Sequence, residues 1–434
     1  MDFLKNFGIS SPSFSSSFYG VGGQYIWLPE FSDVGDSIKT SEDKVFSILN
    51  KAAKKHYCDW HFMRYAMNPE DMRGCKELVL SMFSSFDEIV LLGTGGSSLG
   101  AKALCELQSS GGFSEKKIHF FDNVDPGSFE VFAKKSSLDR VGVLVITKSG
   151  GTPETLAQLT YFIDLWKKVQ GKDAIAKQFI CITEPKDSPV SRLAKLYKIR
   201  CLAHDTLLGG RFSVVSKVGL LPFFLTGGDS DLFQQGLEQV AKYLLAPEKL
   251  PAVSFVAAHN FLEKKCCLDD VIVTVYGDAW RYVPTWFMQL WAESLGKQGK
   301  GTMPIGSLGT QDQHSLLQLF LDGPNNKFFT IIISKDYGKT SVLQPEDMGL
   351  DYLRGKTLGD LMEAEAWATV RTLVERKAPV RVLHLDVLKE KALGVVMLNW
   401  MLETALQAGV WGVDAFDQPA VEKGKILTKE YLGR

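Results

Sequence analysis

Apolar residues recur along the chain in short, nearly continuous runs, separated by longer stretches in which apolar and polar residues follow a helical spacing. Five such runs lie between residues 88 and 205: EIVLLG, KIHFFD, VGVLVITKS, FICITE and RCLAHD. Runs without polar positions are typical of strands that are buried on both faces, as in a parallel sheet covered by helices. We therefore predict a parallel sheet of five strands here, with helices on both faces.

The same pattern returns in the second half, in DVIVTVYG from Asp270, KFFTIIISK from Lys327 and VRVLHLD from Val380. These three runs are again joined by long stretches with helical patterns. The fold class is therefore predicted to be α/β, with a second sheet of the same kind.

A domain boundary is expected within residues 227–251, where glycine, charge and proline surround one amphipathic pattern. We predict a first α/β domain over residues 61–240 and a second over residues 241–434. Residues 1–60 are expected to be a lead-in and helices that pack on these domains.

The most hydrophobic long segment, residues 392–412, is interrupted by Asn399, Glu403 and Gln407 at helical spacing. This pattern predicts a helix of a soluble protein with one side facing water, and no membrane span.

The overall charge indicates that any anionic ligand is held locally. The 434 residues include 49 basic and 50 acidic side chains, a net charge of -1, which gives no general attraction to nucleic acid or to an anionic membrane. Seven cysteines without a C-x-x-C pair suit a reducing compartment, and the first residues lack a secretory pattern. We expect a cytoplasmic protein.

The first candidate site is the stretch LLGTGGSSLGAK, residues 91–102, at a predicted strand-to-helix turn. It matches neither common nucleotide motif, because Ala101 replaces the P-loop lysine and Ser98 replaces the third glycine of the dinucleotide fingerprint. A loop containing Gly96 and Ser97 can still offer backbone N–H groups and hydroxyls to an anion. An ordinary tight turn would give the same local pattern.

The second candidate is TKSGGTPET, residues 147–155, after the third predicted strand. Its hydroxyls and its lysine precede a helix that opens with Pro153, and such a helix start suits a phosphate monoester. The candidate ligands are Thr147, Lys148, Ser149 and Thr152. A solvated loop with a plain threonine cap is the alternative, and no Walker acid or magnesium pattern accompanies it.

Two further segments carry opposite charges. In GGRFS, Gly210 lets Arg211 approach a ligand without crowding, and the planar guanidinium suits paired anionic oxygens. In WAESLGKQGKG, Glu293 ends a helical pattern that begins near Ala279 and stops at Gly296. A carboxylate there can serve as a general base. Taken singly, each also fits an ordinary surface residue.

Proton-transfer residues are available in two more segments, QDQHS with His314 and FDQPAVEKGK with Gln418 and Lys425. Gln418 and Lys425 lie about two turns apart on one side of a helix that begins near Pro419. No histidine has a metal-ligand spacing, so we expect neither a metal nor a cofactor.

Together, GTGGSSLG, GGRFS, ESLGKQGKG, QDQHS and FDQPAVEKGK, in this order, resemble the glucose-6-phosphate isomerase (phosphoglucose isomerase) family. The resemblance covers most of the chain. It implies two sugar-isomerase (SIS) type α/β/α sandwich domains with parallel-rich sheets, in a homodimer whose active sites lie at domain and subunit interfaces. The chain differs from the family pattern at Thr147, where serine is common, and at Gly151, where threonine is common.

The resemblance also implies roles for individual residues. Glu293 resembles the base that moves a proton between carbons 2 and 1, and Arg211 resembles the residue that stabilises the cis-enediolate. Lys425 matches a residue that opens the sugar ring, as does His314, which is expected from the partner subunit. The implied substrate-binding residues are Gly96, Ser97, Thr147, Lys148, Ser149, Thr152, Gly210 and Gln418.

Other readings remain open at this point. A dual-specificity phosphoglucose/phosphomannose isomerase would keep all these residues. A non-catalytic sugar-phosphate-binding regulator would keep the phosphate loops but lose Glu293, His314 and Lys425, and would carry a DNA-binding motif. An enzyme that makes glucosamine 6-phosphate would need a leading cysteine, whereas the first cysteine is Cys58.

Overall fold

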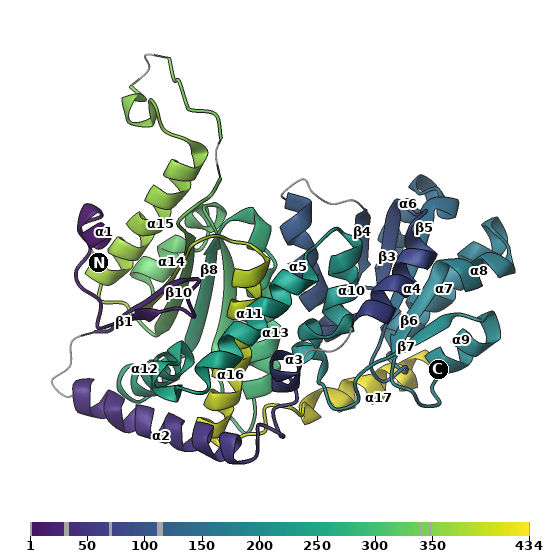
Figure 1. Ribbon diagram of the computed structural model, residues 1–434, viewed down its shortest axis with the longest axis horizontal. Helices are drawn as coiled ribbons and strands as arrows, with labels where there is room; N and C mark the ends of the chain where they lie inside the picture. The colour runs from purple at the N-terminus through teal and green to yellow at the C-terminus, as the bar shows by residue number, and fades with distance from the viewer. Residues whose placement is uncertain are drawn as a thin grey trace.

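The computed structural model of the protein describes residues 2–29, 34–68, 72–110, 116–338, 340–346 and 349–433. Within these residues the strands form two separate sheets, of five and six strands. The sheets lie next to one another in Figure 1, each flanked by helices, which gives the elongated body of the molecule.

The first sheet has the order β4-β3-β5-β6-β7, and all its neighbouring strands are parallel. The strands are β3 (Glu88–Leu92), β4 (Lys117–Phe121), β5 (Val141–Ile146), β6 (Phe179–Thr183) and β7 (Arg200–Ala203). These are the five strands that the apolar runs predict. The prediction of a parallel sheet is therefore confirmed.

Helices cover both faces of this sheet, as expected. One face carries α6 (Pro126–Lys135), α7 (Pro153–Val169), α8 (Lys172–Gln178) and α9 (Pro189–Tyr197). The other carries α4 (Arg73–Phe83), α5 (Leu99–Ser110) and α10 (Lys217–Leu225). Every residue of β5 is buried, because it lies at the centre of the sheet between these two layers.

The second sheet has the order β1-β2-β11-β10-β8-β9. Its strands are β1 (Phe14–Ser17), β2 (Gly22–Trp27), β8 (Asp270–Tyr276), β9 (Met303–Gly309), β10 (Lys327–Ser334) and β11 (Val380–Leu385). The runs at Asp270, Lys327 and Val380 are confirmed as β8, β10 and β11, which are parallel with β9. The strand β2 pairs antiparallel with β11.

Three strands of this sheet were not predicted from the sequence. β9 has the sequence MPIGSLG and β2 has GGQYIW, so neither forms a continuous apolar run, and β1 is the short polar stretch FSSS. The helices around this sheet are α1 (Asp2–Asn6), α2 (Val34–Lys54), α12 (Pro251–Cys266), α13 (Val283–Leu295), α14 (Leu317–Asp322), α15 (Leu358–Glu375) and α16 (Glu390–Trp411). The domain limits at residues 60 and 240 remain a prediction.

Two helices lie between the halves: α3 (Met63–Met67) packs on α11 (Ser230–Tyr243), which in turn packs on α16. The two glycines Gly236 and Gly394 allow α11 and α16 to approach closely, since a Cβ on Gly236 would lie 2.3 Å from the backbone oxygen of Lys391.

The helix α16 corrects one prediction. By length and composition it could cross a membrane, but 94% of its most apolar stretch is buried inside the protein, as in a core helix. The predicted water-facing side is wrong, because Asn399, Glu403 and Gln407 are all fully buried. Glu403 pairs with Arg381 at 2.5 Å and Asn399 accepts a hydrogen bond from Tyr19 at 2.7 Å, so these polar groups face a buried network.

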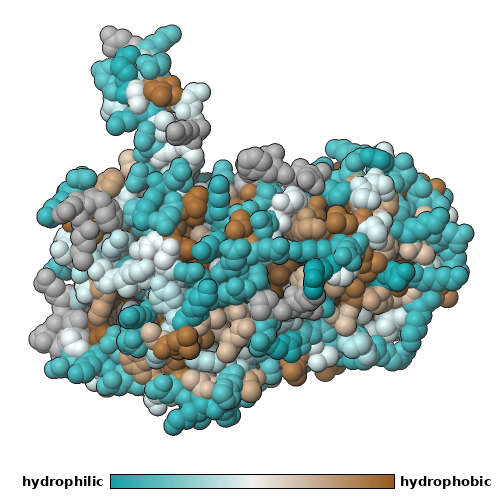
Figure 2. Space-filling model, in the orientation of Figure 1, coloured by the Kyte–Doolittle hydropathy of each residue, from teal (hydrophilic) through white to brown (hydrophobic). Residues whose placement is uncertain are grey.

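Two parts extend from the body. The segment between β10 and α15 projects as an arm that stands clear of the rest in Figures 1 and 2. The helix α17 (Glu422–Leu432) runs below the first sheet, and its described side chains are almost all exposed. Both carry exposed apolar side chains, including Tyr352 on the arm and Ile426 and Leu432 on α17.

Candidate functional site

The two predicted anion loops meet at the carboxyl edge of the first sheet. They follow the neighbouring strands β3 and β5, and a Cβ added to Gly93 would lie 2.9 Å from the backbone oxygen of Ile146. The first loop contains the short 3-10 helix η1 (Gly95–Ser97), which leads into α5. Its N–H groups and the Ser97 hydroxyl therefore lie beside the start of the second loop.

The second loop is ordered by its own hydroxyls. The Thr147 and Thr152 hydroxyls lie 3.2 Å apart, and the Ser149 hydroxyl accepts a hydrogen bond from the Gly151 N–H at 3.2 Å. Pro153 opens α7, as predicted. This arrangement collects several donors at one helix start.

Lys148 of the same loop lies 3.9 Å from a carboxylate oxygen of Glu184. Burial lowers the pKa of the Lys148 ammonium, and the nearby Glu184 carboxylate opposes this shift. The lysine thus adds a positive charge at the edge of the loop.

The loop with GGRFS touches the first anion loop backbone to backbone. A Cβ on Gly96 would lie 2.2 Å from the carbonyl carbon of Gly210, and Ser213 donates a hydrogen bond to the Gly96 oxygen at 3.2 Å. Only glycine allows this approach at position 96. The contact brings Arg211, in the 3-10 helix η3 (Gly210–Val215), next to the first anion loop.

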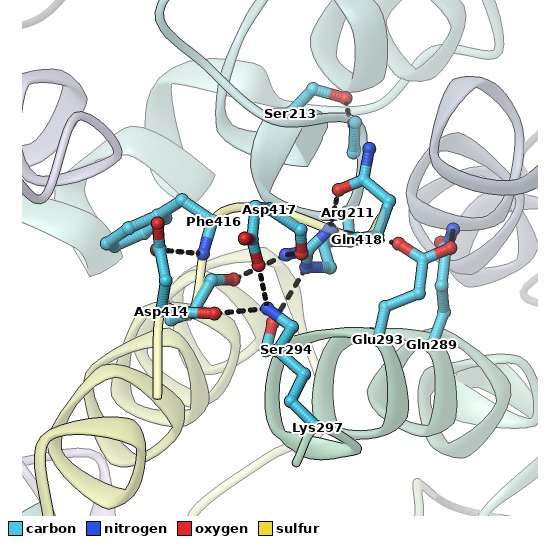
Figure 3. A network of polar contacts seen from close by, with 12 residues as sticks. Arg211, Ser213, Gln289, Glu293, Ser294, Lys297, Asp414, Phe416, Asp417 and Gln418 are labelled. Carbon is cyan, nitrogen blue, oxygen red and sulfur yellow. Dashed lines mark hydrogen bonds and ion pairs between the residues drawn. The ribbon is translucent and has the colours of Figure 1, made fainter. Parts of the chain in front are cut away.

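Arg211 is buried and all five of its N–H groups have acceptors (Figure 3). Nε donates to Ser294 at 2.7 Å, and Nη1 donates to Glu293 Oε2 at 3.1 Å and to Gln418 Oε1 at 2.9 Å. Nη2 donates to the backbone oxygens of Ala415 and Asp417.

These contacts join three distant segments at one guanidinium group. Burial lowers the pKa of Arg211, and the Glu293 carboxylate opposes this shift. The structure therefore brings together Arg211, Glu293 and Gln418.

Glu293 lies on α13, which ends at Gly296 as predicted, although the helix begins at Val283, four residues later than expected. Its two carboxylate oxygens have different partners: Oε2 accepts from Arg211, and Oε1 accepts from Gln289 Nε2 at 3.3 Å. The Glu293 side chain is 36% exposed, so a ligand can still reach it.

Gln289 is a site residue that the sequence analysis missed. A Cβ on Gly95 would lie 3.0 Å from Gln289 Nε2, so this amide lies between the first anion loop and Glu293. Its Oε1 atom is buried without a hydrogen-bond partner in the described structure. The available signal was its spacing, since Gln289 precedes Glu293 by four residues and shares its helix face.

Two lysines after Glu293 were also missed. Lys297 pairs with the Asp417 carboxylate at 2.7 Å and donates to the Asp414 oxygen, and Lys300 donates to the Trp411 oxygen at 2.5 Å. Lys297 ties the chain that follows α16 to the segment after α13, as Figure 3 shows, and Lys300 ties the end of α16 itself to that segment. They fix the segment from which Gln418 reaches Arg211.

His314 is exposed in the 3-10 helix η6 (Gln311–His314), far from this group. The helix α13 runs back along β9, since Gly306 of β9 faces Pro284 and Met288 in the first half of α13. His314 follows the end of β9, whereas Glu293 lies at the other end of α13, a helix roughly 20 Å long. Within one chain the structure does not bring the two together.

Lys425 lies on the exposed helix α17, after the short turn η8 (Pro419–Val421). Its ammonium pairs with the exposed Glu422 carboxylate at 2.6 Å. In this structure Lys425 therefore has a surface partner, while Gln418 at the start of the same segment contacts Arg211.

Comparisons with known proteins show the family of this chain. A family model described as Phosphoglucose isomerase matches residues 75–433. The chain belongs to the phosphoglucose isomerase family. It is 36% identical to the glucose-6-phosphate isomerase of Thermus thermophilus over 80% of this chain and 84% of that protein. It is 32% identical to the glucose-6-phosphate isomerase of Campylobacter jejuni, over 79% and 85% of the two chains.

Solved structures share the phosphoglucose isomerase fold. A hypothetical protein from Thermus thermophilus superposes with a TM-score of 0.85 at 31% identity, covering 94% of this chain and all of that one. A glucose-6-phosphate isomerase from Chlamydia trachomatis gives a TM-score of 0.81 at 21% identity, covering 96% and 89% of the two chains. The predicted SIS-type α/β architecture is confirmed.

Proposed function

We propose that this protein is a glucose-6-phosphate isomerase of glycolysis and gluconeogenesis, which reversibly converts glucose 6-phosphate into fructose 6-phosphate. The observation that carries the proposal is the contact between Arg211 and Glu293 beside two anion loops. Isomerisation removes a proton next to a carbonyl group, so it needs a base and a positive charge where the enediolate oxygen develops. This site has one of each.

The phosphate of the sugar binds at the two loops. Its oxygens accept hydrogen bonds from the N–H groups around Gly96 and from the Ser97, Thr147, Ser149 and Thr152 hydroxyls, with Lys148 nearby. The phosphate is remote from the reacting carbons, so its binding energy orients the other end of the sugar.

At that other end, Glu293 takes the proton from carbon 2 and returns it to carbon 1 through a cis-enediolate. Gln289 holds one Glu293 oxygen and leaves the carboxylate aimed beside Arg211. Arg211 stabilises the enediolate oxygens, while Gly210 keeps the approach open and Gln418 binds a sugar hydroxyl. These proposed steps use side-chain groups of the chain alone.

We further propose a homodimer in which His314 acts on the substrate bound to the partner subunit. The distance between His314 and Glu293 along α13 supports this arrangement, because one chain cannot place both on the same sugar. The exposed apolar residues of the arm and of α17 supply surface for such an interface. His314 and Lys425 then open the sugar ring, which requires Lys425 to exchange Glu422 for the substrate.

A cytoplasmic location is proposed with this activity. All seven cysteines are free, which fits a reducing compartment.

The test is a coupled assay in EDTA, in which purified protein converts fructose 6-phosphate and the glucose 6-phosphate formed is measured. A parallel assay with mannose 6-phosphate tests the dual-specificity alternative. We expect turnover of fructose 6-phosphate. Binding of the sugar phosphate without any turnover would instead identify a non-catalytic phosphosugar-binding protein.

A further inference from the structure

Two cysteines face one another across the last two strands of the first sheet. Cys181 of β6 and Cys201 of β7 are direct partners in the parallel ladder, so their side chains project from the same face. Neighbouring strands lie about 4.8 Å apart, within the Cα separation of about 4.4–6.8 Å that a disulfide spans. β7 is the edge strand, so it can shift without disturbing a further neighbour.

The two thiols have different surroundings. Cys181 is fully buried among the residues under α9, whereas Cys201 is exposed. Cys201 lines a cavity of about 620 Å³ that is bordered by both basic and acidic side chains, namely Lys186, Lys195, Lys198, Glu184 and Asp187. The thiolate is the reactive form of a cysteine, and this cavity gives a peroxide access to the Cys201 sulfur.

The interaction between the thiols assigns them different roles. The neighbouring Cys181 side chain lowers the pKa of the Cys201 thiol to about 7. The same interaction, together with burial, raises the pKa of Cys181. At neutral pH Cys201 is the nucleophile, and Cys181 is the neighbour that can react with it afterwards.

We propose that Cys201 and Cys181 form a reversible disulfide when a hydroperoxide oxidises Cys201. The Cys201 thiolate attacks one oxygen of the hydroperoxide, an S–O bond forms as the O–O bond breaks, and hydroxide or alkoxide leaves and takes up a proton. The Cys181 sulfur then attacks the Cys201 sulfur, the S–O bond breaks and water leaves with the Cys181 proton. Two thiols lose two electrons in total, and the peroxide gains them.

The site lies close to the second anion loop but is separate from it. The Thr147 N–H donates to the Ile182 oxygen at 3.0 Å, one residue after Cys181. Neither cysteine belongs to the proposed substrate-binding or catalytic set, so the inference does not depend on the proposed function.

The experiment treats the reduced, full-length protein with hydrogen peroxide in small molar excess, followed by intact-mass measurement and peptide mapping. We expect loss of two hydrogen atoms, a cross-linked pair of peptides containing Cys181 and Cys201, and full reversal by dithiothreitol. In Cys181→Ser the reaction should stop at a sulfenic acid on Cys201, which dimedone traps. Cys267→Ser, which removes another exposed thiol, should leave the cross-link unchanged.

Two results would overturn the proposal: Cys201 remains a thiol while other cysteines react, or it is oxidised to sulfinic acid without any cross-link to Cys181. Mapping of the wild-type protein gives this answer even if a variant fails to fold. The readout is a mass, so an inactive isomerase would not affect it.

Discussion

The Nη1 atom of Arg211 lies 3.1 Å from the Oε2 atom of Glu293, although 82 residues separate them along the chain. The contact joins the η3 segment beside the first sheet to the end of α13 beside the second. A carboxylate and a permanent cation are thereby held together at the junction of the two halves, next to the two predicted anion loops.

Arg211 should not be replaceable by lysine. A lysine ammonium has three donors and no planar fork, so it cannot replace the five hydrogen bonds that Arg211 donates. We expect Arg211→Lys to lower kcat about 100-fold, because a preorganised donor to the enediolate is lost. Arg376→Lys, at an exposed ion pair with Asp322, is the matched control and should keep full turnover. Equal activity of both variants would show that charge alone suffices.

The backbone contact between Gly96 and Gly210 predicts an asymmetric pair of variants. A Cβ on Gly96 would lie 2.2 Å from Gly210, whereas a Cβ on Gly210 meets nothing nearer than 3.6 Å. Gly96→Ala should therefore cost about 1–3 kcal/mol of stability and weaken binding of inorganic phosphate, and Gly210→Ala should cost much less. Thermal unfolding and calorimetric phosphate titration measure the two effects. Similar losses in both variants would contradict the described loop contact.

The buried His259 predicts how stability changes with acid. It packs against Trp291 and Trp411, and burial lowers the pKa of His259 to about 3. The unfolded chain takes up this proton below its usual pKa of about 6.5, so stability is present above that pH and is lost as the pH falls.

Between pH 6.5 and 5 this group should lower the free energy of unfolding by about 1–2 kcal/mol. Urea unfolding of His259→Gln, which cannot titrate, should show a correspondingly smaller pH dependence. The same slope in both proteins would mean that His259 is protonated in the folded state.

Mixing two inactive variants tests whether His314 acts across a dimer. In a heterodimer of Glu293→Gln and His314→Ala, one site contains both substitutions and the other contains neither. Random exchange of subunits should then restore about one quarter of wild-type activity in a two-fold symmetric dimer. No recovery, with heterodimers demonstrated by native mass spectrometry, would place His314 in the same site as Glu293 of its own chain.

The sequence predicted the buried strands well because β3, β5 and β10 are short, nearly continuous apolar runs. Such runs are typical of strands that are covered by helices on both faces. The prediction failed at β9, where Gly306 and Ser307 interrupt the pattern. The sequence also wrongly predicted that the face of α16 carrying Glu403 is exposed to water. Helical spacing of polar residues is the same whether they face water or a buried partner such as Arg381.

In the candidate site, too, local patterns could be predicted from the sequence, whereas contacts between distant segments could not. Local motifs suggested Arg211, Glu293 and Gln418 as separate candidates, and the structure places Glu293 and Gln418 in direct contact with Arg211. Gln289 was not singled out because its function depends on the neighbouring first anion loop, a contact that no local pattern encodes.

The most direct measurement is the turnover of fructose 6-phosphate by Glu293→Gln, beside wild type and Glu130→Gln, a control on the exposed face of α6. Glutamine keeps the size of the side chain but cannot take the proton. We predict that Glu293→Gln lowers kcat about 1000-fold, as expected for loss of a general base, while its thermal unfolding and that of Glu130→Gln match wild type. Turnover by Glu293→Gln at the wild-type rate would contradict the central claim that Glu293 moves the proton.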